Sequence, residues 1–115
     1  MDLTTHKGLT NEQISLGLRD KNANIRRAAV SNENATEEHI SLGLKDEDIG
    51  VRCAAINHVN ATPEQISLGL NDESWCIRYF AVSHEKATKE QILKALKDED
   101  YHVRQVANIR TIKGI

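Results

Sequence analysis

Histidine and cysteine are the side chains of this sequence that could bind a metal ion, but their spacing does not suit one. His58 and His84 lie 26 residues apart, at equivalent positions of an internal repeat, and His6 shares that position. Two ligands of one zinc ion must both lie within about 2 Å of it, whereas helices in contact run about 8–10 Å apart. Cys53 and Cys76 share no close ligand motif. We expect no metal site, no cofactor, no catalytic residue and two free thiols.

Aromatic residues could act by binding a partner. They make up only 3% of the chain, yet Trp75, Tyr79 and Tyr101 stand at positions that vary between repeats. Exposed Trp and Tyr side chains are typical of binding hot spots. The alternatives for Trp75 are that it covers the junction of the third and fourth repeats, or that it is an exposed ring without a function. The predicted partner-binding residues are Trp75, Tyr79, Tyr101, His102, Ile49, Arg27 and Gln105.

Four arginines could bind phosphate, but each follows an aspartate by six residues. The pairs are Asp20 and Arg26, Asp46 and Arg52, Asp72 and Arg78, and Asp98 and Arg104. An aspartate so placed can neutralise the arginine, and we expect these pairs to be structural. Arg19, Lys45 and Lys97 could form a mild basic stripe, but acidic residues stand beside two of them, which favours a solvated charged face.

A repeat of 26 residues organises the whole chain. Its copies begin at Thr10, Thr36, Thr62 and Thr88. Each copy buries its apolar face only against its neighbours, so the sequence predicts one repeat domain over residues 1–115. The expected parts are an N-terminal cap over 1–9, repeats over 10–35, 36–61, 62–87 and 88–113, and a C-terminal cap formed by the end of the last repeat.

Each repeat predicts two short helices. The first begins after the threonine, which forms a capping box with glutamine three residues later, or with His39 in the second copy. Apolar residues four apart, such as Ile14 and Leu18, predict its buried stripe. A glycine recurs inside this helix at Gly17, Gly43 and Gly69, which suggests that another backbone passes close by.

The second helix is expected to begin after Asn22, Asp48, Ser74 and Asp100, which are favourable N-cap residues. Both helices span two to three turns and need stacking for stability. After Ala107 the pattern decays, and Arg110 and its neighbours match no upstream copy. We expect this end to have a polar outer face.

The overall composition restricts the function. With 115 residues and a formal net charge of −2, the chain has little long-range field to attract polyanions, which disfavours nonspecific nucleic-acid binding. No apolar run approaches the ~20 residues needed to span a bilayer, and no secretory signal is evident at Met1. The expected compartment is a reducing cytoplasm.

The aspartate, arginine and alanine of the second helix, as in Asp46, Arg52 and Ala55, followed by an Ile/Leu helix, resemble the HEAT-like α-solenoids. The closest likeness over residues 10 to 107 is to short-repeat relatives, the leucine-rich repeat variant and the bilin-lyase type. The resemblance implies an all-α, short right-handed α-solenoid of four two-helix repeats, in which the second helix can be 3₁₀. It also implies a polar ladder between neighbouring repeats, formed by the four aspartates and four arginines named above. The cysteine cluster of the variant family is missing.

The preferred function is a non-enzymatic adaptor or inhibitor that binds another protein through the variable positions of the second helices. The first alternative is a nucleic-acid-binding HEAT-like module. A less favoured one is a chromophore-handling protein similar to the bilin lyases. We expect no membrane association, a weak homodimer through the end repeats as one option, and a bacterial or phage-like source.

Overall fold

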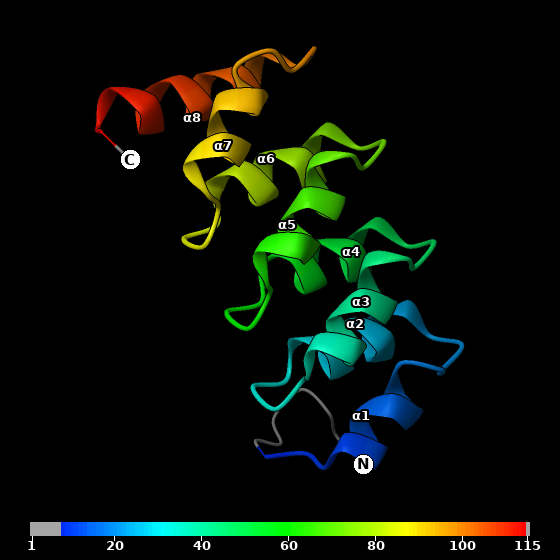
Figure 1. Cartoon of the computed structure of the whole chain (residues 1–115). Helices are drawn as coiled ribbons and strands as arrows, with labels where there is room; N and C mark the ends of the chain where they lie inside the picture. The colour runs from blue at the N-terminus through cyan, green and yellow to red at the C-terminus, as the bar shows by residue number, and fades with distance from the viewer. Residues whose placement is uncertain (1–7, 115) are drawn as a thin grey trace. The chain divides into compact units, whose positions relative to one another are not determined.

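The computed structural model of this chain describes residues 8–114, which contain eight α-helices and no strand. The helices are α1 (Asn11–Gly17), α2 (Ala23–Ser31), α3 (Glu37–Leu44), α4 (Ile49–Ile56), α5 (Pro63–Leu70), α6 (Trp75–Ser83), α7 (Lys89–Ala95) and α8 (Tyr101–Ile112) (Figure 1). They form two compact units, Met1–Ala61 and Thr62–Ile115, here called unit 1 and unit 2. The predicted all-α class is confirmed, and the second helix of each repeat is α rather than 3₁₀.

The first helix of each repeat begins at a capping box. In α1, Thr10 Oγ1 accepts a hydrogen bond from the Gln13 N–H at 3.1 Å, and Gln13 Oε1 accepts one from the Thr10 N–H at 2.9 Å. Gln65 and Gln91 do the same in α5 and α7. In α3, His39 replaces the glutamine, and its Nδ1 accepts the Thr36 N–H at 3.0 Å. The four predicted start sites are therefore correct.

The second helices begin at Asn22, Asp48, Ser74 and Asp100, as predicted. The side chain of each N-cap accepts a backbone N–H of the first turn, which satisfies a donor that has no partner within the helix. Within unit 1, α1 packs on α2 and α3 on α4, and α2 and α4 lie side by side. Unit 2 repeats this arrangement with α5, α6, α7 and α8.

The core of each unit consists of aliphatic side chains from both helices of a repeat. In unit 1 the fully buried large side chains are Leu9, Ile14, Val30, Ile40, Val51 and Ile56. In unit 2 they are Ile66, Ile77, Val82, Ile92 and Val103. Leu9, from the predicted N-terminal cap, packs with Ile14, Ala29 and Ala35. Residues 1–7 of the predicted cap lie outside the described part of the chain.

At Gly43, inside α3, glycine is required by neighbouring side chains rather than by a passing backbone. A Cβ atom added to Gly43 would lie 2.9 Å from both Ala55 Cβ and Val30 Cγ2. These two residues belong to α4 and α2, and both are fully buried. The expectation of a close backbone is therefore wrong for Gly43, and the physical reason for glycine is the tight seating of α3 on α2 and α4.

Arginines of the second helix link consecutive repeats within each unit. Arg26 Nε donates to Asp46 Oδ2 at 2.9 Å in unit 1, and Arg78 Nε donates to Asp98 Oδ2 at 2.9 Å in unit 2. The aspartate six residues before the arginine contributes its backbone carbonyl instead, as Asp20 does to Arg26 Nη1 at 2.9 Å. The sequence expectation of neutralisation by that preceding carboxylate is therefore wrong in these two cases. The carboxylate comes from the following repeat, because the arginine points along the stack.

The end of α8 differs from the other second helices. It runs to Ile112, for 12 residues, where α2, α4 and α6 have eight or nine. Its outer side exposes Ile109 and Ile112, the latter at 83%, so it is less polar than the sequence suggests. Arg110 Nη1 donates to the carbonyls of Val82 at 2.7 Å and His84 at 2.8 Å. These bonds fix the extra turn of α8 against the end of α6.

Candidate functional site

Aromatic residues gather where α6 and α8 begin. Trp75 and Tyr101 are the first residues of these two helices, and Ser74 and Asp100 cap them. Because α6 and α8 lie side by side, Trp75 reaches the first turn of α8. Its indole stacks on the imidazole of His102, with ring centroids 4.7 Å apart and an interplanar angle of 22°. Trp75 remains 41% exposed and Tyr101 60% exposed.

Tyr79 extends this group by one helical turn. Its ring meets Trp75 edge to face at 6.3 Å and meets Phe80 in the same way at 5.6 Å. Tyr101 contacts His102 edge to face at 5.6 Å. The structure therefore brings four predicted binding residues together, and we call Trp75, Tyr79, Tyr101 and His102 the aromatic surface.

A hollow of about 250 Å³ opens beside the aromatic surface. Its walls are Trp75, Cys76, Tyr79, Phe80 and His102. We call it the aromatic hollow. Cys76 is a free, partly buried thiol at this site, and Cys53, the other cysteine, lies on α4 in unit 1.

The remaining predicted binding residues have different surroundings. Gln105 is exposed one turn after Tyr101 on α8. Arg27 and Ile49 are exposed on α2 and α4 of unit 1. Arg27 is equivalent in sequence to Tyr79, and its Cδ lies 3.7 Å from the point where a Gly50 Cβ would stand. Unit 1 thus has an arginine where unit 2 has an aromatic ring.

The histidines that share a repeat position have structural roles. His58 Nε2 donates to the Asn32 carbonyl at 2.8 Å, and His58 Nδ1 accepts the Asn60 N–H at 2.9 Å. His84 Nδ1 likewise accepts the Lys86 N–H at 3.0 Å. These bonds use both ring nitrogens of His58. Within residues 8–114, no three His, Cys, Asp or Glu side chains are grouped to hold a metal ion.

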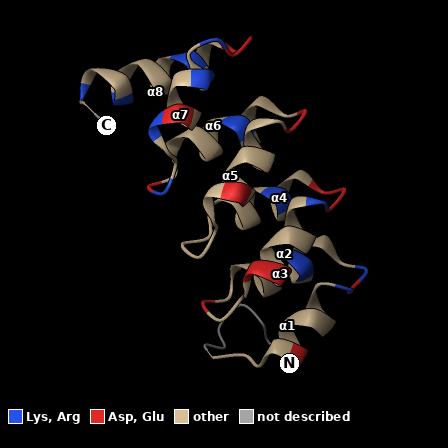
Figure 2. Cartoon of the chain, in the orientation of Figure 1, with Lys and Arg blue, Asp and Glu red and all other residues tan. Residues whose placement is uncertain are grey.

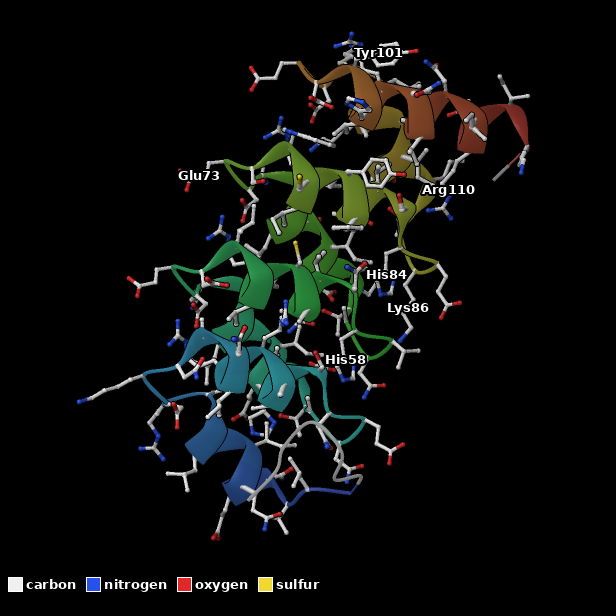
Figure 3. All side chains as sticks on the ribbon, turned by 180° about the vertical axis from the view of Figure 1, so that it is seen from behind. His58, Glu73, His84, Lys86, Tyr101 and Arg110 are labelled. Atoms are coloured by element: carbon white, nitrogen blue, oxygen red, sulfur yellow. The ribbon has the colours of Figure 1, made fainter. Side chains whose placement is uncertain are left out.

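Arg110 belongs to the same series, which corrects the view that it matches nothing upstream. It lies 26 residues after His84 and bonds the carbonyl of that residue, just as His58 bonds the carbonyl of Asn32. Figure 3 labels His84 and Arg110 in unit 2. The longer arginine performs the function of the histidine because α8 continues as a helix here, where the earlier repeats turn into a loop.

An exposed leucine of the first helix was missed by sequence reasoning. Leu16, Leu42 and Leu68 occupy equivalent positions and are 68%, 57% and 55% exposed. The signal was available, because each leucine lies two residues after the buried isoleucine and so points away from its face.

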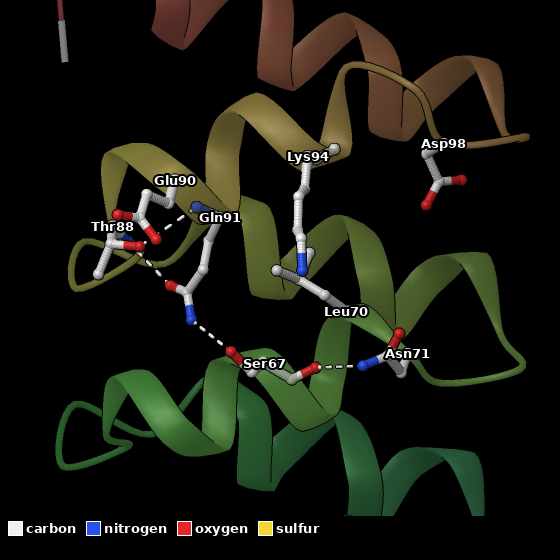
Figure 4. A pocket seen from close by; sticks show the side chains of 9 residues that line it. Ser67, Leu70, Asn71, Thr88, Glu90, Gln91, Lys94 and Asp98 are labelled. Carbon is white, nitrogen blue, oxygen red and sulfur yellow. Dashed lines mark hydrogen bonds between the residues drawn. The ribbon is translucent and has the colours of Figure 1, made fainter.

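A polar groove of about 340 Å³ lies between α5 and α7 in unit 2. Gln91 Nε2 bonds Ser67 Oγ and the Pro63 carbonyl across it, both at 2.7 Å, and Asn71 Nδ2 bonds the Ser67 carbonyl at 3.1 Å. Figure 4 shows the bonds of Ser67 with Gln91 and with Asn71, and the Lys94 side chain extending from α7 toward α5. The groove is thus crossed by hydrogen bonds that join two repeats, which indicates a structural role.

Comparison with known families gives a match over part of unit 1. The model of the HEAT repeat associated with sister chromatid cohesion matches residues 38–59. These residues run from α3 through α4 to the loop after it, so this part of unit 1 is a HEAT-like repeat. No curated protein and no solved structure matches the chain. HEAT repeats usually form helical scaffolds for protein interaction and are typically not catalytic. No helix within residues 8–114 is long and apolar enough to cross a membrane.

Proposed function

We propose that this protein is a non-enzymatic adaptor or inhibitor that binds another protein through the aromatic surface of α6 and α8. The observation that carries the proposal is the stacking of Trp75 on His102 beside an open apolar hollow. A buried ring would need no further partner, whereas Trp75 keeps 41% of its surface exposed. The ring therefore covers the junction of two second helices and also presents a face to a partner.

The chemistry of the surface suits a protein ligand. Trp and Tyr supply large contact areas with few rotatable bonds, so they lose little entropy on binding and dominate hot spots. Trp75 and Tyr79 are held by ring contacts to His102 and Phe80, which orders them before a partner arrives. Tyr101, Gln105, Arg27 and Ile49 stand at the same variable positions of the second helices, and we propose them as further contacts.

The remaining features follow the resemblance of the repeats. We propose one domain over residues 1–115 with four repeats over residues 10–113, related to the short-repeat HEAT variants and working in the cytoplasm without a cofactor. A weak homodimer through the last helix would cover the exposed Ile109 and Ile112 of α8. The nucleic-acid alternative predicts retention on duplex DNA at moderate salt, and we expect none.

Affinity capture from a nuclease-treated native lysate tests the proposal. The baits are the wild type, the Trp75→Ala/Tyr79→Ala variant and a Leu68→Ala control, which removes an exposed apolar side chain from α5 in the same unit. We expect the wild type and the control to retain the same protein, identified by mass spectrometry, and the double variant to lose it with native helical circular dichroism. Retention by the double variant and loss from Leu68→Ala would move the site to the first helices.

A further inference from the structure

We propose that the aromatic hollow receives an arginine side chain from a basic segment of the partner protein. This inference rests on the proposed function, because it names the chemistry of the partner at the same surface. It rests on the size of the hollow, the nature of its walls, the charges beside it, and the arrangement at the equivalent place in unit 1.

The size of the hollow suits one side chain. Its volume of about 250 Å³ is below the ~300–1,000 Å³ of pockets that take drug-sized ligands. Four of its wall residues belong to α6 and the fifth, His102, belongs to α8. The hollow therefore lies on the surface of this one pair of helices. A single long side chain projecting from a partner would fill such a space.

The walls favour a side chain with an apolar stem and a cationic end. Trp75, Tyr79 and Phe80 present aromatic rings, and guanidinium groups are attracted to the faces of Trp and Tyr. The guanidinium is planar and stacks on rings, which the ammonium of lysine does not. Its methylene stem can pack on the same apolar walls.

The charges beside the hollow are acidic. Asp100 Oδ1 lies 3.5 Å from Nδ1 of His102, which is one of the walls. Glu73 precedes the N-cap of α6 and is exposed, and Glu99 precedes the N-cap of α8 with its side chain 88% exposed. Figure 2 shows acidic residues at the tips of both loops of unit 2 that lead into second helices.

Positive groups near the hollow are mostly engaged elsewhere. Arg78 of α6 is buried, pairs with Asp98 at 2.9 Å and lies 3.7 Å from the exposed carboxylate of Glu99. Arg104 of α8 donates to the carbonyls of Asp98 and Glu99 at 2.8 and 2.9 Å. Lys97 is the exposed cation of the loop before α8, and it is followed by three acidic residues. The balance of exposed charge is therefore negative.

Unit 1 contains an internal arginine at the equivalent place. A Cβ on Gly50, which corresponds to His102, would lie 3.7 Å from Arg27 Cδ and Nη1 and 2.9 Å from Asp48 Oδ1. The stem of Arg27 thus lies over the first turn of α4, near the aspartate that caps it. In unit 2 the corresponding aspartate is Asp100, and Tyr79 replaces Arg27. The partner would supply the arginine that this pair of helices lacks.

Short peptides test the proposal directly. The probes are acetylated and amidated pentapeptides Gly-Ser-Xaa-Ser-Gly, with arginine, norleucine or glutamate as Xaa, added to the full ¹⁵N-labelled chain. Trp75 is the sole tryptophan, so its indole N–H resonance reports on the hollow alone. We expect the arginine peptide to shift this resonance saturably, with a dissociation constant of about 1 mM. We expect norleucine to bind at least about fivefold more weakly, since it lacks the charge, and glutamate to give no shift.

A variant that lacks two carboxylates separates the electrostatic contribution to arginine binding from the contribution of packing. Glu99→Gln/Asp100→Asn removes two carboxylates, and asparagine caps a helix as well as aspartate does. We expect this variant to raise the dissociation constant of the arginine peptide by about tenfold, because each exposed charge pair contributes up to about a factor of five to binding. The matched control is Glu47→Gln/Asp48→Asn, at the equivalent positions before α4, which should leave the titration unchanged.

The outcomes distinguish this inference from the proposed function. If the arginine and norleucine peptides shift the Trp75 resonance equally, and Glu99→Gln/Asp100→Asn changes neither titration, the arginine inference is overturned. The protein-binding surface would then still stand. Failure of every peptide to move the Trp75 resonance would overturn the arginine inference as well. The capture experiment with Trp75→Ala/Tyr79→Ala judges the protein-binding function independently.

Discussion

The α2 and α4 pair of unit 1 and the α6 and α8 pair of unit 2 have the same framework but different surfaces. Both begin at equivalent N-caps, both bury aliphatic residues, and both link repeats through an arginine and the aspartate twenty residues later. At the exposed first turns, unit 1 has Arg27 over Gly50, whereas unit 2 has Tyr79 and Trp75 beside His102. The repeated residues therefore maintain the stack, and the variable ones determine what each surface can bind.

Substitution of the buried glycine should have the largest effect on the framework. Gly43→Leu should destabilise the protein by about 3 kcal/mol or more, because even the first added carbon would lie 2.9 Å from Ala55 and Val30. Thermal unfolding should show a fall in Tm of more than about 10 °C.

The control is Gly50→Ala, at a variable position. Its Cβ would lie 2.9 Å from Asp48 Oδ1, a side-chain end that can shift. The equivalent residues Asn24, Cys76 and His102 carry a Cβ beside their own N-caps. We expect a change within about 0.5 kcal/mol. Equal Tm values for the two variants would contradict the distinction between repeated and variable positions.

Loss of an inter-repeat arginine should rank next. Arg78→Ala leaves Asp98 partly buried without its guanidinium partner, and breaking such a pair costs about 3 kcal/mol. Chemical denaturation measures this loss of unfolding free energy as a lower midpoint, and the m value should stay unchanged. Arg27→Ala, an exposed arginine of the equivalent helix, should cost less than about 0.5 kcal/mol. If both variants lose a similar amount of unfolding free energy, the ion pair of Arg78 with Asp98 contributes no more to stability than an exposed arginine does.

Transfer of the exposed residues of unit 1 to unit 2 tests the comparison between the two surfaces most sharply. The triple variant Trp75→Ala/Tyr79→Arg/His102→Gly gives unit 2 the residues that unit 1 has at Ala23, Arg27 and Gly50. Binding to the captured partner should weaken by at least about thirtyfold, or about 2 kcal/mol, since two aromatic anchors are lost. Calorimetric titration measures the affinity, and circular dichroism should show an unchanged helical content. Unaltered affinity would refute the aromatic surface as the binding site.

The loss of folding stability at acid pH that Asp46 of unit 1 causes should be the smallest of these effects. Burial opposes the charged form of Asp46, but hydrogen bonds from Arg26 and the Asp48 N–H outweigh it, and the pKa of Asp46 is lowered. The unfolded chain therefore takes up the proton first as the pH falls. The stability contributed by Asp46 is present above its unfolded pKa of about 3.9 and is lost as the pH falls through the lower folded value.

Urea unfolding at a series of pH values checks this response. Asp46→Asn should be less stable at neutral pH and should show a shallower loss of stability in acid than the wild type. Glu47→Gln, an exposed neighbour, serves as the control. An Asp46→Asn variant with the same acid slope as the wild type would contradict the role of this carboxylate.

Most of the framework could be predicted because its cause is local. Thr10 with Gln13, and Asp48 before α4, fix helix starts through contacts within one turn. The partner of Arg26 could not be deduced in the same way, since it depends on how two repeats stack. Gly43 likewise indicated a close approach, but only packing identified Ala55 and Val30 as its neighbours.

The candidate site was predicted in its residues but not in its geometry. Variation between copies pointed to Trp75, Tyr79 and His102, yet their rings meet only because α6 and α8 lie side by side. The role of Arg110 was missed because its hydrogen bonds go to carbonyls 26 and 28 residues earlier. Leu16 and its equivalents were not singled out, although their spacing of two residues from the buried isoleucine places them on the opposite face of the helix.

Photo-crosslinking at Tyr79 tests the central claim most directly. A chain carrying Tyr79→p-benzoylphenylalanine is expressed in native cells beside one carrying Leu68→p-benzoylphenylalanine, and both are irradiated. The account predicts a covalent adduct with one partner protein from position 79, lost on Trp75→Ala, and none from position 68. An adduct from position 68 with none from position 79 would place binding on the first helices and contradict the aromatic surface as the functional site.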